Sequence, residues 1–145
     1  MKNYYFDTSA LVKLYHEESG TDKVENIFSS EDSTIIISEF AVVELYSTFY
    51  RLLRMNEITN VILKSIIETF ENDCKFRFLI KPINSGIFNG AKELIIKYGS
   101  KKSIRTLDAI QLSVSLKMKD IMFVSGDELL LECAEDEDLK VLKVS

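Results

Sequence analysis

Five short runs of apolar residues, rich in β-branched and aromatic side chains, predict β-strands. They are KNYYFD (2–7), STIIIS (33–38), FLIKPI (78–83, ended by Pro82), IMFVS (121–125) and LKVLKV (139–144). The second run consists almost entirely of strand-forming residues, which is typical of a strand that is buried on both faces. We therefore expect a sheet whose strands lie inside the molecule.

Between these runs the apolar residues recur every three to four positions, which predicts amphipathic helices. The expected helices span residues 9–17, 19–31, 39–54, about 59–77, 85–99, 103–119 and 127–136. Ser38 is a natural N-cap for the third of them, and Glu39 favours the positive end of that helix. In the sixth helix the pattern places Thr106, Ser113 and Lys117 on the side that faces solvent.

The alternation of strands and helices predicts the α/β class, with a parallel sheet and helices on both of its faces. A length of 145 residues fits one domain, and no linker or internal repeat divides residues 1–145. The first strand is not followed by G-x-G-x-x-G, and the chain has no Walker loop. A dinucleotide-binding or P-loop site is therefore not supported.

The composition is that of a globular protein, with 46% apolar residues, one proline and five glycines. No apolar run approaches the ~20 residues of a membrane helix, and the first residues lack the apolar segment of a signal peptide. We therefore expect a cytoplasmic protein that does not contact a membrane. Cys74 and Cys133 form no C-x-x-C pair, which favours buried thiols over a redox or zinc motif.

Two acids are expected at the same edge of the predicted sheet. Asp7 ends the first strand and is followed by the hydroxyl residues Thr8 and Ser9, whereas Asp127 lies two residues beyond Ser125 at the end of the fourth strand. Ligands of open parallel sheets bind outside the carboxyl ends of the strands. Both acids also occupy positions where helix N-caps occur, so a purely structural role stays open for each.

Two further acids lie within predicted helices. Asp108 shares a strip of its helix with Gln111 and Ser115, inside the apolar arc. A carboxylate there needs a partner, because a buried unpaired charge is costly, and a metal ion, an arginine or a backbone cap would each serve. Glu44 falls outside the main apolar face of its helix, so its local pattern indicates an exposed carboxylate paired with Arg51.

The segments YFDTSALVKLY, ISEFAVVEL, RTLDAIQLSVSL and FVSGDELLLECA occur in this order along the chain. Together they resemble a PIN domain, and in size and motif style the toxin ribonuclease of a VapBC-type toxin–antitoxin pair. The resemblance covers essentially the whole chain. It rests on four acids, each in its own expected context and in the expected order, rather than on any single motif.

The resemblance implies a PIN-like (Rossmann-like) sheet of about five parallel strands and a set of site residues. The acids that hold Mg²⁺ or Mn²⁺ and carry catalysis in PIN domains match Asp7, Glu44, Asp108 and Asp127. The hydroxyl positions that support the first acid match Thr8, Ser9 and Ser125.

The implied chemistry is metal-dependent hydrolysis of RNA phosphodiester bonds by an endoribonuclease. Hard divalent cations prefer carboxylate oxygen, and a cation also offsets the repulsion between crowded carboxylates. In the leading version the chain is the toxin of a type II toxin–antitoxin module, with RNA as substrate and a cognate antitoxin as protein partner. A homodimer is left open.

The net charge of −5 is an objection to RNA binding, because phosphate contacts need Lys and Arg. The chain has 23 acidic and 18 basic residues, and setting the four site acids aside leaves 19 against 18. The basic residues placed to reach a phosphate backbone are Arg51, Arg54, Lys101, Lys102 and Arg105. The alternative for most of them is an ordinary solvated surface.

Three other functions compete with the toxin. One is a solitary PIN-domain nuclease for RNA processing that has no antitoxin. Another is a non-catalytic PIN-like binding module, which four intact acids argue against. A third is a phosphotransfer or phosphatase domain of the receiver or haloacid-dehalogenase kind, which also has an Asp at the end of its first strand. The segment FDTSA lacks the second nearby Asp that those chemistries use, so we disfavour this third function.

Overall fold

Five parallel strands form one sheet in the computed structural model, in the spatial order β3-β2-β1-β4-β5. The strands are β1 (Lys2–Phe6), β2 (Ser33–Ser38), β3 (Phe78–Lys81), β4 (Ile121–Ser125) and β5 (Lys140–Lys143), and the structure describes all 145 residues. The chain moves outward from β1 to β3 and then returns to the other side of β1, so the strand order reverses between β1 and β4. The predicted α/β fold is confirmed.

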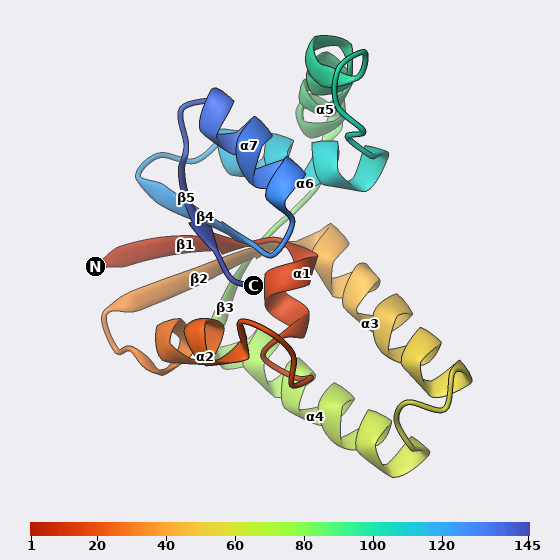
Figure 1. The fold of residues 1–145 in the computed structure, drawn as a ribbon. Helices are drawn as coiled ribbons and strands as arrows, with labels where there is room; N and C mark the ends of the chain where they lie inside the picture. Colours follow the sequence, from red (N-terminus) through yellow and green to blue (C-terminus); the bar gives the residue numbers. More distant parts are fainter.

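Seven helices cover the two faces of the sheet (Figure 1). One face carries α1 (Thr8–Val12), α2 (Thr21–Ser29), α3 (Glu39–Arg54) and α4 (Asn60–Phe76). The other face carries α5 (Ser85–Tyr98), α6 (Thr106–Leu116) and α7 (Glu128–Asp136). None of these helices combines the length and the hydrophobicity that crossing a membrane requires.

Side chains alternate between the two faces along each strand, and each set forms its own core. In β1 the fully buried Tyr5 packs with residues of α5 to α7, whereas the fully buried Phe6 packs with residues of α1 to α4. In β2 the same alternation sends Ile36 to one core and both Ile35 and Ile37 to the other. The carboxyl-terminal parts of β1 and β2 are therefore buried on both faces, as the continuous apolar run of β2 predicts.

The cap predicted at Ser38 is present. Its hydroxyl oxygen accepts a hydrogen bond from the backbone N–H of Ala41 at 3.1 Å. The helix that follows begins at Glu39 and ends at Arg54, the predicted bounds. β2 therefore passes into α3 without a loop, which places the first turns of α3 at the carboxyl edge of the sheet.

The first helix is shorter than predicted. It ends at Val12 rather than near residue 17, and a loop leads to α2. The Thr21 hydroxyl donates to the carbonyl oxygen of Lys13 at 3.0 Å, which draws the start of α2 back against the end of α1. Gly20 adopts a φ of 94° in this loop, where a Cβ would lie 2.1 Å from the carbonyl oxygen of Val144. Only glycine fits both the left-handed backbone and this close approach.

Ser113 is also placed differently from the prediction. It is buried rather than solvent-facing, and its hydroxyl donates to the carbonyl oxygen of Ile87 at 2.7 Å. The helical period cannot reveal that α5 packs across this side of α6, with Gly90 leaving room for the Ser113 side chain.

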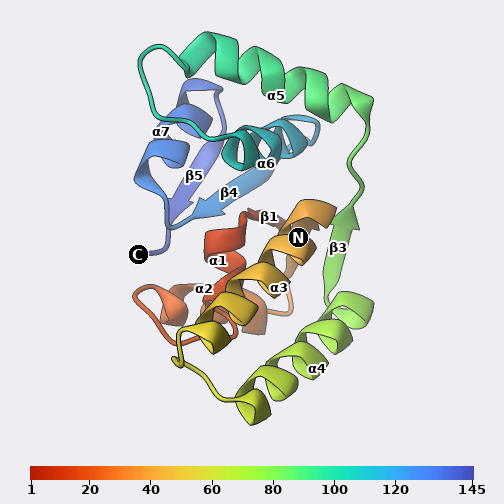
Figure 2. The same ribbon diagram turned by 90° about the vertical axis from the view of Figure 1, so that its right-hand side faces the viewer.

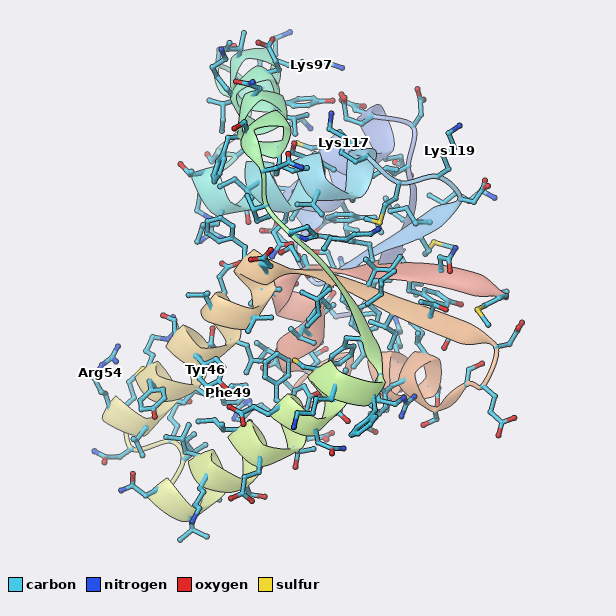
Figure 3. The ribbon with its side chains drawn as sticks, turned by 180° about the vertical axis from the view of Figure 1, so that it is seen from behind. Tyr46, Phe49, Arg54, Lys97, Lys117 and Lys119 are labelled. Atoms are coloured by element: carbon cyan, nitrogen blue, oxygen red, sulfur yellow. The ribbon has the colours of Figure 1, made fainter.

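Helices α3 and α4 lie side by side and extend past the end of the sheet (Figure 2). Phe49 and Tyr46 lie between them, as Figure 3 shows, and Phe49 is fully buried. The Tyr46 hydroxyl donates to Glu71 of α4 at 2.7 Å. This packing fixes the direction of α3, and with it the side chains that α3 presents at the edge of the sheet.

Candidate active site

Asp7 lies directly after β1 and caps α1. Its Oδ1 accepts hydrogen bonds from the Ser9 hydroxyl at 2.7 Å and from the Ala10 N–H at 3.0 Å, and its Oδ2 accepts from the Ser125 hydroxyl at 2.5 Å. The residue is 4% exposed. Burial raises the pKa of Asp7 to about 6, against the hydrogen bonds from Ser125, Ser9 and Ala10, and the nearby Asp108 carboxylate adds to the rise.

The hydroxyls of Ser9 and Ser125 also organise the neighbouring turn. Ser9 Oγ accepts from the N–H of Gly126 at 2.9 Å, and Ser125 Oγ accepts from the N–H of Asp127 at 2.9 Å. The ends of β1 and β4 are thereby joined through the two serines and Asp7. This is the point where the strand order of the sheet reverses, which is where ligands of such folds bind.

Glu44 lies on α3 and is half-buried. Its Oε1 accepts from the Thr8 hydroxyl at 2.6 Å and from the Gln111 side-chain amide at 3.1 Å. The local interpretation of Glu44 as an exposed partner of Arg51 is therefore wrong. Residues of α1 and α6 reach the side of α3 that its helical period assigns to solvent.

Asp108 and Asp127 share one arginine. Arg105 Nε donates to Asp108 Oδ2 at 3.1 Å, and its guanidinium lies 3.9 Å from Asp127 Oδ2. Asp127 also caps α7, because its Oδ1 accepts from the Leu130 N–H at 3.2 Å. Its other oxygen faces Arg105, so the cap does not exclude a role in the site. The side chain of Asp108 is 16% exposed and that of Arg105 is 77% exposed.

All four predicted acids line one pocket of about 400 Å³ at the carboxyl edge of the sheet. Only one residue that lines this pocket is hydrophobic. We call the pocket the acidic pocket, and its lining residues are Asp7, Thr8, Ser9, Val12, Glu18, Glu44, Thr48, Arg51, Arg105, Asp108, Gln111 and Asp127. Glu18 is paired with the buried Lys13, whose Nζ lies 2.9 Å from Glu18 Oε1. The remaining four carboxylates face only two guanidinium groups, so the pocket carries a local excess of negative charge.

The donor set of the acidic pocket suits a hard divalent cation. Its ligating groups are carboxylate and hydroxyl oxygens, and no His or Cys lines it. As the side chains stand, no three acids converge closely enough to hold an ion. Arg105 lies against two of them, Asp108 and Asp127. The chemistry of the donors fits Mg²⁺ or Mn²⁺.

The five basic residues that were expected to contact RNA are distributed unevenly. Arg51 and Arg105 line the acidic pocket. Arg54 lies at the far end of α3, away from the sheet (Figure 3). Lys102 is paired with Glu132 of α7, with 2.9 Å between Nζ and Oε2, whereas Lys101 is exposed. The pocket therefore gathers two of the five, and the two lysines lie on the connector that leads into α6.

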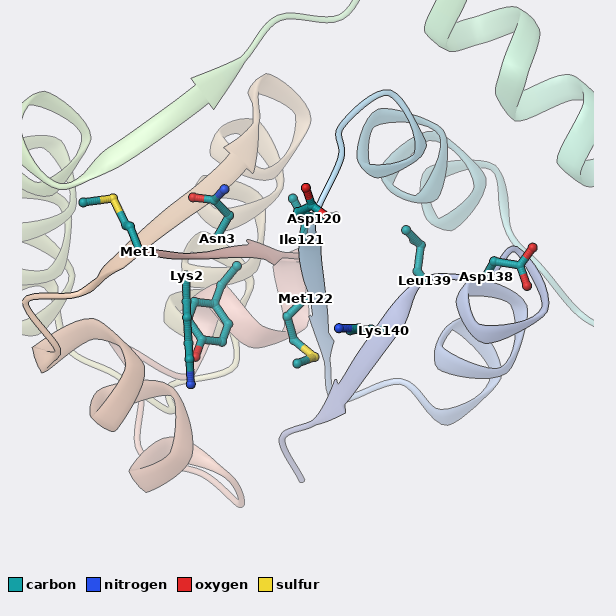
Figure 4. Close-up of a pocket in the computed structure, with 10 residues that line it drawn as sticks. Met1, Lys2, Asn3, Asp120, Ile121, Met122, Asp138, Leu139 and Lys140 are labelled. Atoms are coloured by element: carbon teal, nitrogen blue, oxygen red, sulfur yellow. The ribbon is translucent and has the colours of Figure 1, made fainter.

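A second cavity of about 400 Å³ lies at the opposite edge of the sheet, where the strands begin (Figure 4). Half of its lining residues are hydrophobic, among them Met1, Ile121 and Met122. It contains none of the predicted site residues. The four predicted acids thus all lie at the carboxyl edge.

The family model of the PIN domain matches residues 4–136. The chain belongs to the PIN domain family. No curated protein matches its sequence. Within this PIN domain the matched segment begins in β1 and ends with α7, so it includes all four acids of the acidic pocket.

Solved structures of low sequence identity share the fold of this PIN domain. FitAcB from Neisseria gonorrhoeae is 18% identical with a TM-score of 0.68, over 97% of this chain and 96% of the other. VapBC2 from Rickettsia felis, bound to a promoter DNA fragment, is 16% identical with a TM-score of 0.68, over 99% of both chains. VapC20 from Mycobacterium tuberculosis, a sarcin-ricin loop cleaving toxin, is 14% identical with a TM-score of 0.67, over 88% and 92%.

Two features of the site were not assigned from the sequence. Gln111 is 3% exposed and bonds to Glu44 and Thr8, although the pattern gave only its place beside Asp108 in an apolar arc. Arg105 pairs with Asp108, although its side chain stays exposed. A polar amide inside an apolar arc is a signal that could have identified Gln111, because a buried amide needs partners. The spacing of three residues between Arg105 and Asp108 could have predicted the ion pair.

Proposed function

We propose that this PIN-domain protein is a divalent-cation-dependent endoribonuclease and the toxin of a type II toxin–antitoxin module. The observation that carries the proposal is the arrangement of four carboxylates around one pocket at the strand-order reversal, with an oxygen-only donor set. Fold relatives that include a VapBC complex and a cleaving toxin support it.

Asp7, Glu44, Asp108 and Asp127 would hold the cation. When bound, Mg²⁺ or Mn²⁺ would lower the pKa of the attacking water and stabilise negative charge that develops on the phosphate. Asp7 is restrained by Ser9, Ser125 and a backbone N–H, so this carboxylate is already oriented before a ligand arrives.

The basic residues would bind the RNA backbone. Arg51 lies on α3 two turns beyond Glu44 and lines the same pocket, so it is placed to bind a phosphate next to the reacting one. Arg105 is bonded to Asp108 without a cation, and its charge becomes available for RNA when a cation replaces it. Phosphate contacts of this kind position RNA without reading its sequence.

Cleavage of a mixed RNA substrate tests the reaction. EDTA should abolish cleavage, and added Mg²⁺ or Mn²⁺ should restore it. The Asp108→Asn variant should be inactive, whereas Asp22→Asn, which changes an exposed acid on α2, should match the wild type. Undiminished cleavage in EDTA would refute the metal-dependent mechanism, and no cleavage under any metal would favour a non-catalytic binding module.

The antitoxin is tested separately from the reaction. Expression of the chain alone should arrest growth, and co-expression with the short open reading frame beside its gene should relieve the arrest. An antitoxin segment that presents Arg or Lys would complement the excess negative charge of the acidic pocket. An active nuclease that is harmless in cells and retains no partner on purification would instead be a solitary RNA-processing enzyme.

A further inference from the structure

The side-chain amide of Gln111 is buried between the two layers of helices. Gln111 projects from α6, which covers one face of the sheet, and bonds to Glu44 on α3, which covers the other face. It lies one helical turn beyond Asp108. A single neutral side chain thus joins the helix that carries Asp108 to Glu44 on the opposite side of the sheet.

Every hydrogen-bonding position of this amide is used. Its Nε2 donates to Thr8 Oγ1 at 3.0 Å and to Glu44 Oε1 at 3.1 Å. Its Oε1 accepts from the hydroxyl of Tyr5 and from that of Ser38, the latter at 3.2 Å. An amide has two donor hydrogens and two acceptor lone pairs, so no capacity remains for solvent or substrate.

The orientation of the amide is determined by its partners. A carboxylate only accepts hydrogen bonds, so the NH₂ group must face Glu44 and the oxygen must face the two hydroxyls. Tyr5 is fully buried, which keeps its hydroxyl protonated and able to donate. Thr8 accepts from Gln111 and its hydroxyl donates a hydrogen bond to the same Glu44 oxygen at 2.6 Å. The hydrogen bonds of this network are therefore all donated in one direction, from the buried core toward Glu44.

We propose that Gln111 is a positioning residue of the acidic pocket, which holds Glu44 at the correct place and orientation for a divalent cation. The proposal rests on the proposed function. With Thr8, Gln111 binds Oε1 of Glu44 and leaves Oε2 without a partner among the side-chain hydrogen bonds. Because the amide is neutral, it orients the carboxylate without removing the negative charge that attracts the cation. Groups that orient metal ligands in this way typically contribute about 10–100-fold to metal affinity.

Calorimetric titration of Mn²⁺ into the metal-free protein tests the role without relying on activity. Gln111→Leu should lower the Mn²⁺ affinity about 10-fold or more. Ser113→Ala is the matched control, because Ser113 is a buried hydrogen-bonded residue of the same helix that faces α5 rather than the pocket. This control should lose stability and keep its Mn²⁺ affinity. A purely structural role for Gln111 would give the same result as the control.

A second variant covers the case in which Gln111→Leu does not fold. Tyr5→Phe keeps the aromatic packing and removes one hydroxyl donor at the far end of the network, so its Mn²⁺ affinity should fall below that of Ser113→Ala. Folded Gln111→Leu or Tyr5→Phe protein that binds Mn²⁺ as tightly as the control overturns the proposal. A wild-type protein that binds no Mn²⁺ overturns the proposed function, and the role of Gln111 with it.

Discussion

The replacement of Asp7 by Asn should stabilise this protein at neutral pH in the absence of a cation. Asp7 is 4% exposed, and burial raises the pKa of its carboxyl group from the usual 3.8 to about 6. At pH 7 the folded protein must therefore keep a charge that burial disfavours. Asn has nearly the same shape and carries no charge, and its side-chain oxygen can still accept from Ser9 and the N–H of Ala10.

The expected magnitude follows from the difference between the two pKa values. A rise from 3.8 to about 6 corresponds to about 3 kcal/mol, at 1.36 kcal/mol for each pH unit. Between these two pH values the unfolded chain has released the proton and the folded protein retains it, so the free energy of unfolding falls as the pH rises. Below pH 3.8 both states are protonated and the penalty vanishes; above pH 6 it is complete. For a chain of this length, 3 kcal/mol corresponds to about 6–12 °C in melting temperature.

Urea unfolding in EDTA, at pH values from 3.5 to 7.5, measures this effect. Asp7→Asn should approach an advantage of about 3 kcal/mol over the wild type at pH 7.5 and lose it near pH 3.5. The exposed Asp22→Asn variant should show little difference at either pH. Adding Mg²⁺ at pH 7.5 should stabilise the wild type more than Asp7→Asn. If the advantage of Asp7→Asn is the same at both ends of the pH range, ionisation of Asp7 does not destabilise the fold and the reasoning fails.

Further substitutions test individual residues of the site and of the connector that leads into α6. Arg105→Gln should raise the Mg²⁺ affinity up to about 5-fold, because an exposed ion pair of at most about 1 kcal/mol no longer competes with the cation; calorimetry checks this. Asp127→Asn should abolish cleavage and keep the melting temperature, whereas Asp127→Ala should also lose about 1 kcal/mol of stability with its helix cap. Asp108→Asn should abolish cleavage with unchanged circular dichroism. In the Asp7→Asn background, replacing both Lys101 and Lys102 by Gln should lower the RNA affinity equally for different sequences. The slope of the logarithm of RNA affinity against the logarithm of salt concentration should fall in magnitude by about 1–2. An unchanged slope would indicate that the arginines, and not these lysines, contact the RNA backbone.

Most of the fold could be predicted because its signals are local. The β2 run and the Ser38 cap each depend on a few consecutive residues, so the end of β2 and the bounds of α3 were predicted correctly. The end of α1 was not, because it depends on a bond from Thr21 to Lys13 outside the helical pattern and on the close approach of Gly20 to Val144, which is distant in sequence. The burial of Ser113 depends on α5 in the same way.

The candidate site shows the same division. Strand ends predicted the edge at which Asp7 and Asp127 would lie, because parallel strands present their carboxyl ends together. The helical period suggested a partner for Asp108 and left open which one; the structure identifies it as Arg105. The environment of Glu44 could not be predicted from its own helix, because its hydrogen-bond donors come from α1 and α6. Only the resemblance to PIN domains placed Glu44 with the other acids.

The four acids of the pocket are stabilised in two different ways. Asp7 and Glu44 are held by uncharged donors, namely serine, threonine and amide groups and a backbone N–H. Asp108 and Asp127 lie instead against Arg105, whose side chain is 77% exposed, and Asp127 also accepts from the N–H of Leu130. Ion pairs with an exposed side chain contribute about 0–1 kcal/mol, so a cation that enters the pocket displaces a weak competitor. The neutral donors need not move when this happens, because they compensate no charge. The excess negative charge of the pocket is therefore oriented by neutral donors at two acids and partly offset by one exposed arginine at the other two. For this reason the net charge of the chain is a poor guide to nucleic-acid binding: the four predicted site acids, among 23 acidic residues in all, line the pocket, where a bound cation would reverse their effect on a phosphate.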